Sequence, residues 1–508
     1  MQSLCSPSRP ASLTKSTAPQ LRTGDFWLGF AGVLSSACFF LALIAYNFVD
    51  IDLWHQMALI RDSLAAGHLL RADVYAYTPT IRPWIDHEWG AGAIAYFGSA
   101  WLGSRIIVVL KWALALGTFL LCLATCSSRK ADVRLFAACA PLAIFLMHLG
   151  FFSAVRAQAY TFFFAALLAF VWEKLEKGST RWLFAWLAVF SLWVNLHGGF
   201  VVGIGLTALY CVEKLLRREH CKPTLLLLAG MLVETWLTPY GSSYFAYLRR
   251  ALSMSRPYSA EWGAVSGLGP LWAVCFVAAL LLAGHAVVKV GIRNTLGLLP
   301  LAATAAEAAL HRKLLPLFAV LWLSYTPAYL QRTGIGNWTL VLIQRRRAFV
   351  MSAWIIVACA SGVSAIRQRP WQLTVPQPIY PVGPVRYLAD QHWHGHLLVP
   401  FRLGAYVTWK LYPAVKVALD SRYEEVFPDD VVKTVFDFYG AVPGWRKPLT
   451  ALPTDLVLVP LDTPVANRMG DTGWVRVYHD QQFDLFASPQ GRLPEVDWSA
   501  LSFSGTLP

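Results

Sequence analysis

The chain has 508 residues, of which 56% are hydrophobic and only 14% are charged. A soluble protein of this length would carry about 25% charged residues, so the composition excludes an ordinary soluble globular protein. It predicts a polytopic α-helical membrane protein. The net charge of +14 does not indicate nucleic-acid binding, because the basic residues fall between apolar runs and form no stripe with stacking aromatics.

The N-terminal segment 1–25 is polar and rich in Ser, Thr and Pro, which predicts a disordered cytoplasmic N-terminus. The apolar run 26–47 follows it. This run is too long for a signal-peptide core and lacks a convincing small-residue cleavage site. We therefore expect an uncleaved first span, at the start of a transmembrane domain that covers residues 26–368.

An unusual polar segment, 48–88, comes directly after this first run. Carboxylates beside a bilayer are costly and usually mark a functional site. If a helix begins near Asp52, then Asp52, His55 and Gln56 share one helix face. Asp50 would lie at the helix entrance, where a carboxylate can cap free N–H groups. We predict a functional role for Asp52, while Asp50 is either a cap or a second functional acid.

A second acidic cluster ends the same segment, where Asp86, His87 and Glu88 stand between Trp84 and Trp89. A carboxylate there can act as a general base or bind sugar hydroxyls, with tryptophans stacking on the sugar ring. The alternative is an interfacial aromatic belt with a satisfied acid. A divalent metal is a further alternative, but no ligand spacing is diagnostic, so we assign no cofactor. Its ligands would come from Asp50, Asp52, Asp86 and His87.

Eleven more apolar runs follow, with five basic clusters between them. All five clusters become cytoplasmic, as the positive-inside rule requires, only if one early run does not cross. The weakest run is 89–103, which is short and broken by three glycines, so we predict a juxtamembrane or re-entrant helix there. About eleven spans remain, with ten to thirteen open, and an odd number places the C-terminal part outside. The basic clusters are Arg129, Lys130 and Arg134; Lys174, Lys177 and Arg181; Lys214, Arg217, Arg218 and Lys222; Lys289 and Arg293; and Arg345, Arg346 and Arg347.

The polar motifs in the short loops all fall on the outer face in this topology. Arg312 and Lys313 lie on the side that should be poor in positive charge, which indicates an anionic ligand such as a lipid phosphate. For other members a structural role is the alternative: a snorkelling cation, a helix cap or a simple turn. The motif residues are Arg156, Gln158, His197, Tyr240, Glu261, His311, Arg312 and Lys313.

The composition changes from about residue 370. Five prolines predict a stiff linker over 369–385. Short strand-like runs follow, and a helical stretch at 429–439 stands among them. Strands alternating with helices predict a small α/β domain over 386–508, which we expect to be extracytoplasmic and to pack over the membrane part. The predicted strands are 396–401, 415–420, 455–461, 474–479 and 483–487.

The order of these motifs resembles that of bacterial multi-spanning GT-C glycosyltransferase-like proteins, distant relatives of protein O-mannosyltransferases and lipid A aminoarabinose transferases. The C-terminal run, from Tyr380-Pro381-Val382 through Asp420-Ser421-Arg422 to Phe486, is similar to the soluble tail of that group. The resemblance covers nearly the whole chain. It is carried by Asp-x-Asp-x-Trp-His at 50–55, Arg82-Pro83-Trp84, Asp86-His87-Glu88-Trp89, Arg156-Ala157-Gln158, Asn195-Leu196-His197-Gly198-Gly199 and His311-Arg312-Lys313.

The resemblance implies a polyprenyl-phosphate-linked sugar as donor and transfer to a glycan, lipid or protein on the outer face of a bacterial cytoplasmic membrane. It places the catalytic aspartate at Asp52 or Asp50, with inversion at the sugar. Where relatives have a Lys-Pro-Pro-like stretch this chain has Arg82-Pro83-Trp84, so donor preference does not carry over. The expected lipid-phosphate residues are Arg156, Gln158, His311, Arg312 and Lys313. The expected substrate residues are Trp54, His55, Trp84, Asp86, His87, Glu88, His197, Tyr240 and Glu261.

Two other classes remain open at this stage. In a polysaccharide or lipid transporter the charged residues would line a pathway, although the chain shows no convincing internal repeat. A catalytically silent relative could serve as a scaffold of envelope glycan assembly. An enzyme requires that the motif residues converge on one outward-facing cavity with a lipid-sized groove.

Overall fold

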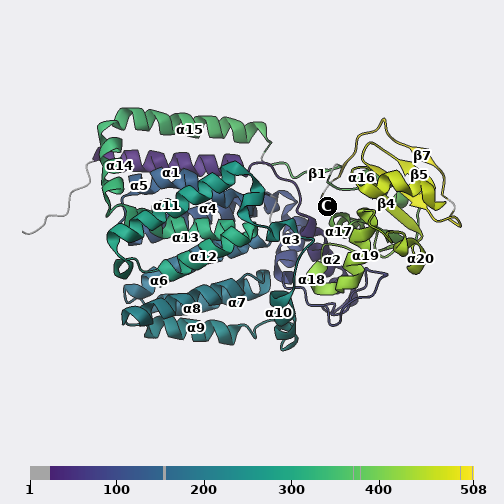
Figure 1. Cartoon of the computed structure of the whole chain (residues 1–508), viewed down its shortest axis with the longest axis horizontal. Coiled ribbons are helices and arrows are strands. Elements are labelled where there is room, and N and C mark those ends of the chain that lie inside the picture. Colours follow the sequence, from purple (N-terminus) through teal and green to yellow (C-terminus); the bar gives the residue numbers. More distant parts are fainter. Residues whose placement is uncertain are drawn as a thin grey trace, which may run out of the picture.

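The computed structural model describes residues 23–152, 156–369, 371–377, 379–491, 493–505 and 507. Most of the predicted N-terminal segment, up to residue 22, and Pro370 and Pro378 of the predicted linker lie outside the described residues. Two parts are visible in Figure 1: a bundle of long helices and, at one end of it, a smaller domain that contains the sheet.

Each of the eleven runs predicted to span the membrane forms one helix of the bundle, and these helices lie side by side (Figure 1). Five of the described helices are long and apolar enough to cross a membrane. A sixth is added if residues 312–330 and α14 (Gly334–Arg345), which meet at 85°, form one broken span. The bundle helices are α1 (Thr23–Leu43), α4 (Arg105–Ser128), α5 (Val133–Met147), α6 (Gln158–Glu176), α7 (Arg181–Leu196), α8 (Phe200–Arg217), α9 (Lys222–Glu234), α11 (Pro270–Val290), α12 (Leu298–Leu310), α13 (Leu315–Leu330) and α15 (Arg347–Arg367).

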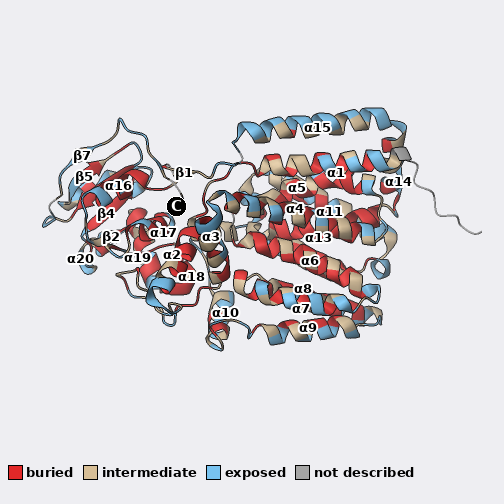
Figure 2. Ribbon diagram, turned by 180° about the vertical axis from the view of Figure 1, so that it is seen from behind, coloured by how far each residue is buried: buried red, intermediate tan, exposed pale blue. Residues whose placement is uncertain are grey.

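Burial differs greatly between these helices (Figure 2). α13 is buried at every position from Leu315 to Leu330, so it is the centre of the bundle. In α15, among its described residues, only Ser361 is buried, although the helix is apolar. A helix that is hydrophobic all round is either enclosed by protein or faces lipid. The chain is therefore a multi-pass membrane protein with α13 inside and α15 at its lipid-facing margin.

The basic clusters gather at the end of the bundle far from the smaller domain, where α14 lies across the helices (Figure 1). Contacts between helix ends agree with this placement: Arg129 pairs with Glu173 at 2.5 Å, and Arg217 donates to the carbonyl of Arg293 at 2.6 Å. We call this the basic end. α3 (Trp89–Leu102) lies at the opposite end beside α2 (Ile51–Ala66) (Figure 1).

The helix α2 begins and ends with clear signals. The Asp50 carboxylate accepts a hydrogen bond from the N–H of Asp52 at 3.1 Å, so Asp50 caps the helix. Gly67 ends it at φ 73°, a left-handed conformation that favours glycine. Leu53, Trp54 and Met57 are buried. The polar segment therefore holds an ordered helix that packs into the protein.

The smaller domain is built on a mixed six-stranded sheet in the order β3-β2-β4-β6-β5-β7. β2 is parallel to β3 and β4, whereas β6 is antiparallel to β4 and β5. Each predicted strand overlaps one observed strand, and α19 has the predicted bounds. The strands are β1 (Val375–Pro376), β2 (Gly395–Leu398), β3 (Val415–Val417), β4 (Leu456–Pro460), β5 (Val475–His479), β6 (Phe483–Ala487), β7 (Val496–Asp497) and β8 (Ser504–Gly505), the last pairing with β1. The helices are α16 (Val382–Asp390), α17 (Phe401–Leu411), α18 (Tyr423–Val426), α19 (Asp429–Tyr439) and α20 (Lys447–Ala451).

Most predicted strand boundaries differ from the structure by one to three residues, and two of the predicted segments extend into a helix. The predicted strand 396–401 ends at Leu398, because Pro400 precedes the first turn of α17, which starts at Phe401. The predicted linker 369–385 contains the start of α16, since proline is tolerated in the first helical turn. In both places the local sequence pattern, apolar in one and proline-rich in the other, continues past the point where a helix begins.

The C-terminal domain is joined to the polar segment by a buried ion network. Arg422 pairs with Asp420 at 2.6 Å and with Asp73 of the polar segment, and all three side chains are almost fully buried. The guanidinium also lies 4.7 Å from the ring centre of Trp84. These contacts fix the segment 48–88 between the bundle and the C-terminal domain, and this position sets the candidate site. The remaining elements are α10 (Ser243–Ser253) and the 3₁₀ turns η1 (His148–Phe151), η2 (Ala260–Trp262), η3 (Val265–Leu268), η4 (Ile292–Asn294), η5 (Arg312–Leu314) and η6 (Pro464–Thr472).

Candidate functional site

A cavity of about 970 Å³ opens at the end of the bundle that carries the C-terminal domain. Its mouth is polar and its depth is apolar, a division that suits an amphiphilic ligand with one charged end. The mouth is lined by His87, Gln158, His197, Arg256, Trp262, His311, Lys313 and Glu424. The apolar part is lined by Val201, Val202, Leu206 and Leu209 of α8, Ala303 of α12 and Leu317 of α13.

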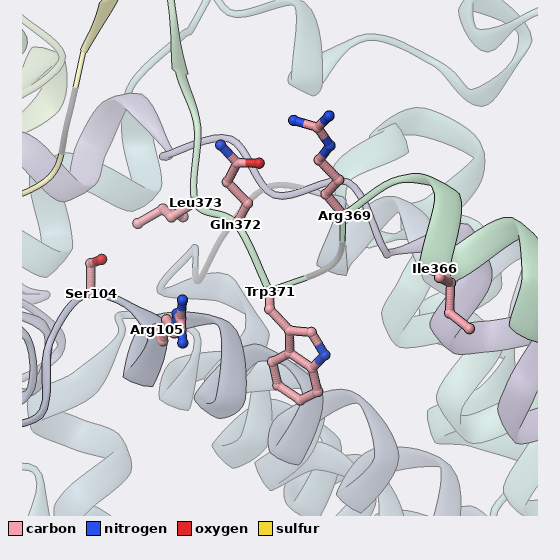
Figure 3. A pocket seen from close by; sticks show the side chains of 7 residues that line it. All are labelled: Ser104, Arg105, Ile366, Arg369, Trp371, Gln372 and Leu373. Atoms are coloured by element: carbon pink, nitrogen blue, oxygen red, sulfur yellow. The ribbon is translucent and has the colours of Figure 1, made fainter.

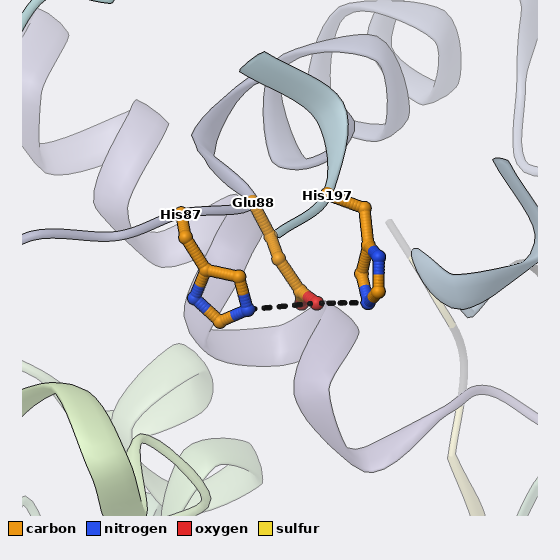
Figure 4. Close-up of side chains that lie close together, drawn as sticks. All are labelled: His87, Glu88 and His197. Carbon is orange, nitrogen blue, oxygen red and sulfur yellow. Dashed lines mark ion pairs between the residues drawn. The ribbon is translucent and has the colours of Figure 1, made fainter. Parts of the chain in front are cut away.

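Glu88 stands at the centre of the polar side chains, between two histidine rings (Figure 4). Its Oε1 lies 3.3 Å from Nε2 of His87 and 3.3 Å from Nε2 of His197, and Gln56 donates to its other oxygen. Burial alone would raise the pKa of Glu88, but the charge and hydrogen bond of His87 lower it below its usual range. Glu88 is therefore an ionised anchor that holds both rings in place.

His87 lies between two carboxylates. Its Nδ1 is 2.8 Å from Oε1 of Glu425, in α18 of the C-terminal domain, and Tyr247 of α10 contacts the same nitrogen at 2.8 Å. Burial works to lower the pKa of His87, but Glu88 and Glu425 outweigh it and raise the pKa well above its usual value. The ring is therefore an imidazolium at neutral pH, with a proton directed at each carboxylate.

His197, at the end of α7, is in the opposite protonation state. Its Nδ1 accepts a hydrogen bond from the N–H of Gly199 at 2.8 Å, and Thr161 contacts the same nitrogen at 2.7 Å. Burial lowers the pKa of His197 to about 3, so the ring is neutral. Nε2 then carries the proton and donates a hydrogen bond to the Glu88 carboxylate. A Cβ on Gly199 would lie 2.1 Å from the Thr161 hydroxyl, so glycine is needed for this close approach.

The hydrogen-bond pattern bears on the metal alternative. His87, Glu88 and His197 place three potential ligand atoms within 4.8 Å of one another. However, a metal on Nε2 of His197 would require a proton on Nδ1, and Nδ1 already accepts from a backbone N–H. We therefore interpret these three residues as a hydrogen-bonded network. A second group with ligand spacing is formed by His55, Asp86 and Glu425.

Asp52 lies beside this network, close to a cation. Its Oδ2 is 4.0 Å from Arg156 Nη2, and Asp50 is 3.9 Å from Arg156 Nε, while Arg156 forms a two-pronged pair with Glu261. Burial, and next the charge of Asp50, raise the pKa of Asp52 well above its usual range, whereas Arg156 opposes this shift. The Asp52 side chain keeps 24% of its surface exposed. It is thus an accessible carboxylate with increased basicity.

Two cations meet at the ring of Trp262. Lys313 Nζ lies 4.3 Å and Arg256 Cζ lies 4.4 Å from ring centres of this indole. Arg256 also donates to Glu424 of the C-terminal domain at 2.5 Å, and His311 contacts the Trp262 carbonyl at 3.0 Å. Burial lowers the pKa of Lys313. An anionic group at the cavity mouth would find both positive charges within one cluster.

Several predicted site residues lie away from the cavity. Both Trp54 and Trp84 are fully buried, so neither offers an open ring face to a sugar. Trp54 instead packs on Tyr406 at 5.0 Å, and Trp84 donates to Glu425 at 3.0 Å. This placement differs from the predicted sugar stacking, because the C-terminal domain covers both rings.

Three further predicted residues make contacts within the protein and do not line the cavity. Asp86 is fully buried and its N–H donates to Tyr240 at 3.3 Å, so these two residues brace the loop behind the cavity. Arg312 does not line the cavity; its backbone N–H donates to the Gly263 carbonyl at 2.8 Å. The second cation of the pair is Arg256 instead.

Sequence reasoning missed residues that come from distant segments. Arg256 and Glu424 line the cavity mouth, while Tyr247 and Glu425 hold His87. Thr161 was also missed. One sequence feature could have indicated Arg256. It lies near Glu261 on a predicted outer loop, where a positive charge breaks the positive-inside rule just as Lys313 does.

A second cavity, of about 620 Å³, lies between the start of α4 and the end of α15 (Figure 3). It is lined by Ser104, Arg105, Ile366, Arg369, Trp371, Gln372 and Leu373. None of these was predicted as a site residue, and Arg105 and Arg369 are exposed. This cavity therefore provides a location for control substitutions.

Comparison with known proteins gives matches in structure and none in sequence. No protein-family model matches the chain, and no curated protein sequence is significantly similar to it. The crystal structure of ArnT from Cupriavidus metallidurans bound to undecaprenyl phosphate matches with a TM-score of 0.51 at 14% identity, over 92% of this chain and 99% of that one. The apo oligosaccharyltransferase of Archaeoglobus fulgidus matches with a TM-score of 0.54 at 10% identity, over 86% and 70%. The archaeal oligosaccharyltransferase AglB, also from Archaeoglobus fulgidus, in complex with an inhibitory peptide and a dolichol-phosphate, matches with a TM-score of 0.53 at 9% identity, over 86% and 70%.

These matches define the fold. ArnT, a lipid A aminoarabinose transferase, and AglB are both GT-C glycosyltransferases. The present chain therefore has the GT-C fold, and the resemblance predicted from its motifs is confirmed at that level. At 9–14% identity the likeness is one of fold alone.

Proposed function

We propose that this protein is a membrane glycosyltransferase that moves a sugar from a polyprenyl-phosphate donor to an acceptor hydroxyl. One observation carries the proposal: a single cavity joins an apolar channel to a mouth that holds two cations, and Asp52 stands in the adjacent cluster. The proposal adds chemistry to the fold, because a fold by itself does not determine a reaction.

The apolar depth of the cavity suits an isoprenoid chain. Val201, Leu206 and Leu209 of α8 face it from one side, and Ala303 of α12 and Leu317 of α13 contribute from the core. Burial of a hydrocarbon chain among such side chains stabilises binding by roughly 25 cal/mol per Å² of apolar surface removed from water. ArnT bound to undecaprenyl phosphate and AglB bound to a dolichol-phosphate support this class of ligand.

The mouth suits the phosphate of the donor. Lys313 and Arg256 meet at Trp262, and His311 is adjacent. Arginine can grip a phosphate through two parallel N–H groups, whereas lysine acts as a point charge. As the bond from the sugar to the phosphate breaks, negative charge grows on the leaving oxygen. These two cations would stabilise that charge.

The transfer step would use Asp52 as the general base. Asp52 takes the proton of the acceptor hydroxyl, the hydroxyl oxygen attacks the anomeric carbon, and the polyprenyl phosphate leaves with the bonding electrons, so the sugar is inverted. Burial makes Asp52 more basic, while Arg156, 4.0 Å away, favours its ionised form. Glu88 and the neutral His197 would position sugar or acceptor hydroxyls at the mouth.

The acceptor would be a glycan, a lipid or a protein. The positive-inside rule would place the basic end in the cytoplasm, and the cavity and the C-terminal domain on the extracytoplasmic side of a bacterial inner membrane. The site would then meet donor and acceptor outside the cell's cytoplasm, in agreement with a lipid-linked sugar as donor.

Mass spectrometry of lipids that copurify with the full-length protein tests the donor class. We expect a polyprenyl phosphate in the wild type and a loss of about tenfold or more in Arg256→Ala and Lys313→Ala, since a hydrogen bond to a charged group contributes about 1.5–3 kcal/mol. Arg105→Ala, in the second cavity, is the matched control. If the wild type binds no added polyprenyl phosphate, or if all variants bind it equally, the proposal is wrong.

A transporter would give a different result. It would bind the lipid-linked sugar and move it across proteoliposome membranes, and Asp52→Asn would leave that movement intact. An enzyme would instead release free polyprenyl phosphate when an acceptor is supplied, and Asp52→Asn would abolish the release.

A further inference from the structure

Behind the cavity wall, three side chains from three segments meet in the protein interior. They are His55 of α2, Asp86 of the loop before α3, and Glu425 of α18. One ring nitrogen and one oxygen from each carboxylate lie within 4.8 Å of one another. All three residues are at most 3% exposed. This buried group is separate from the network of His87, Glu88 and His197, although Glu425 contacts His87.

Two of these side chains have atoms without a partner. Among the described residues, neither Nδ1 of His55 nor Oδ2 of Asp86 has a hydrogen-bond partner, and both atoms are shielded from solvent. A buried polar atom without a partner costs about 1–3 kcal/mol, and more when it is charged. Two such atoms in one group, each of a type that ligates metals, indicate a bound species.

The charges around the group point to a cation. Five carboxylates gather in this part of the interface, from Asp73, Asp86, Glu88, Asp420 and Glu425. The cations that face them are Arg422, held between Asp420 and Asp73, and His87, held between Glu88 and Glu425. Arg250 reaches this region but donates to the backbone carbonyls of Glu424 and Glu425. The carboxylates therefore outnumber the cations that pair with them.

A carboxylate also lies near the other ring nitrogen of His55, and the Glu425 carboxylate is held by two hydrogen bonds. Nε2 of His55 lies 3.9 Å from Oδ1 of Asp52. Metal-binding histidines commonly direct their second nitrogen at a carboxylate, which orients the ring. The Glu425 carboxylate is held by Trp84 at 3.0 Å and by His87 at 2.8 Å, so it too is fixed in place.

We propose that His55, Asp86 and Glu425 bind a divalent first-row cation, with the chemistry of zinc, that ties the polar segment to the C-terminal domain. Imidazole nitrogen and carboxylate oxygen are both zinc ligands, and three protein ligands leave a fourth position for water. Ligands about 2.1 Å from a tetrahedral zinc lie about 3.4 Å apart, so a small inward movement from the present spacing completes the site. The cation would satisfy both orphan atoms and offset the excess of carboxylates.

The test measures metal directly and does not depend on the proposed transfer reaction. The full-length protein, purified in detergent through a tag without histidines and loaded with zinc or manganese, is analysed by elemental mass spectrometry after dialysis. We expect about one equivalent of cation per chain. Asp86→Asn and His55→Gln, which keep the size of the side chain, should each lose at least tenfold of it.

Control variants separate this site from its neighbour. His197→Gln removes a potential ligand of the other group and should leave the metal content unchanged. A chelator should lower the melting temperature of the wild type and have no such effect on Asp86→Asn, which distinguishes metal loss from misfolding. If the wild type binds no stoichiometric cation, or if His197→Gln loses it while His55→Gln retains it, the inference is overturned.

Discussion

Both ends of the helical bundle hold close ion pairs, but the site end also holds carboxylates that are only loosely paired. At the basic end the charges form close pairs: Arg129 with Glu173 and Lys214 with Glu176, each at 2.5 Å. At the site end Asp52 stands 4.0 Å from Arg156, and one oxygen of the buried Asp86 carboxylate has no hydrogen-bond partner among the described residues. A tight pair compensates most of the cost of burial. A looser one leaves a group whose pKa moves and whose contacts can be given to a ligand.

We interpret the close pairs at the basic end as structural, and the loosely paired acids at the site end as the groups that carry the proposed function. Substitutions at the basic end should change the stability of the protein and leave sugar transfer unchanged. Substitutions at the site end should change transfer and leave stability nearly unchanged. The predictions that follow test this division, from the largest expected effect to the smallest.

The largest effect should come from Asp52→Asn. The amide cannot accept the acceptor's proton, so transfer should fall by about 10²–10⁴-fold, the usual contribution of a general base. The cap of α2 is supplied by Asp50 and remains, so folding should persist. Sugar transfer from a polyprenyl-phosphate donor in membranes provides the measurement. Asp25→Asn, which removes a carboxylate paired with Arg134 at the basic end, is the control and should keep full transfer.

At the basic end, Glu173→Gln should mainly change stability. It leaves the buried Arg129 without its anion, which costs about 3–5 kcal/mol when a buried pair is broken. Thermal unfolding in detergent should show a lowered midpoint, while transfer per folded molecule stays near the wild-type rate. The double variant Arg129→Met with Glu173→Gln should recover part of the stability. A loss of specific transfer activity in a folded Glu173→Gln protein would contradict the division.

Arg256 and Arg312 should differ in their effect on donor binding, a difference that the sequence does not show. Arg256→Ala should weaken donor affinity by about tenfold or more, because a charge-assisted contact is lost. Arg312→Ala should change affinity little, since Arg312 does not line the cavity. Donor titration by fluorescence or calorimetry compares the two. Equal losses would place Arg312 at the phosphate as well.

The pH profile of sugar transfer should be set by the ionisation of Asp52. A general base works when deprotonated, and burial raises the pKa of Asp52 above that of an ordinary aspartate. Transfer should therefore fall with decreasing pH at a higher pH than an exposed aspartate would give. Arg156 lowers this pKa, so Arg156→Gln should move the acidic limb to still higher pH, as measured by kcat/KM profiles. Arg312→Gln should leave the limb in place.

The smallest effects concern two aspartates that cap helices at opposite ends. Asp132 accepts from the N–H of Arg134 at 2.8 Å at the start of α5, as Asp50 does for α2. Replacement of either by alanine should cost about 1 kcal/mol of stability, visible as a small shift in melting temperature. Asp50→Ala should also alter transfer, because Asp50 lies 3.9 Å from Arg156. Asp132→Ala should not.

Much of the fold and part of the site were predictable from local pattern. The apolar runs gave the helices of the bundle, the five strand-like runs gave strands, and the spacing after residue 50 gave a helix capped by Asp50. These features depend on residues within a turn or a strand of each other. The motif residues His87, Gln158, His197, His311 and Lys313 also line the cavity.

The partners of these residues were not predictable. Glu425 holds His87 from a position 338 residues further along the chain. Arg256, which sequence reasoning did not single out, lines the cavity, whereas Arg312 is not among the lining residues. Trp54 and Trp84 were expected at a sugar because of their neighbours in sequence, but the C-terminal domain covers both rings. Each of these outcomes depends on which surfaces of separate segments meet.

The sequence by itself determined a polytopic helical membrane protein with an α/β tail, and it concentrated the functional candidates in the polar segment and the short loops. Hydrophobic periodicity and charge placement act over a few residues and against a bilayer, so they can be inferred without a fold. Tertiary structure alone decided which acid is reachable, which histidine is charged, and where a cavity opens. Those properties arise from burial and from contacts between segments far apart in the chain, and burial and contact are what set a pKa or leave a space for a ligand.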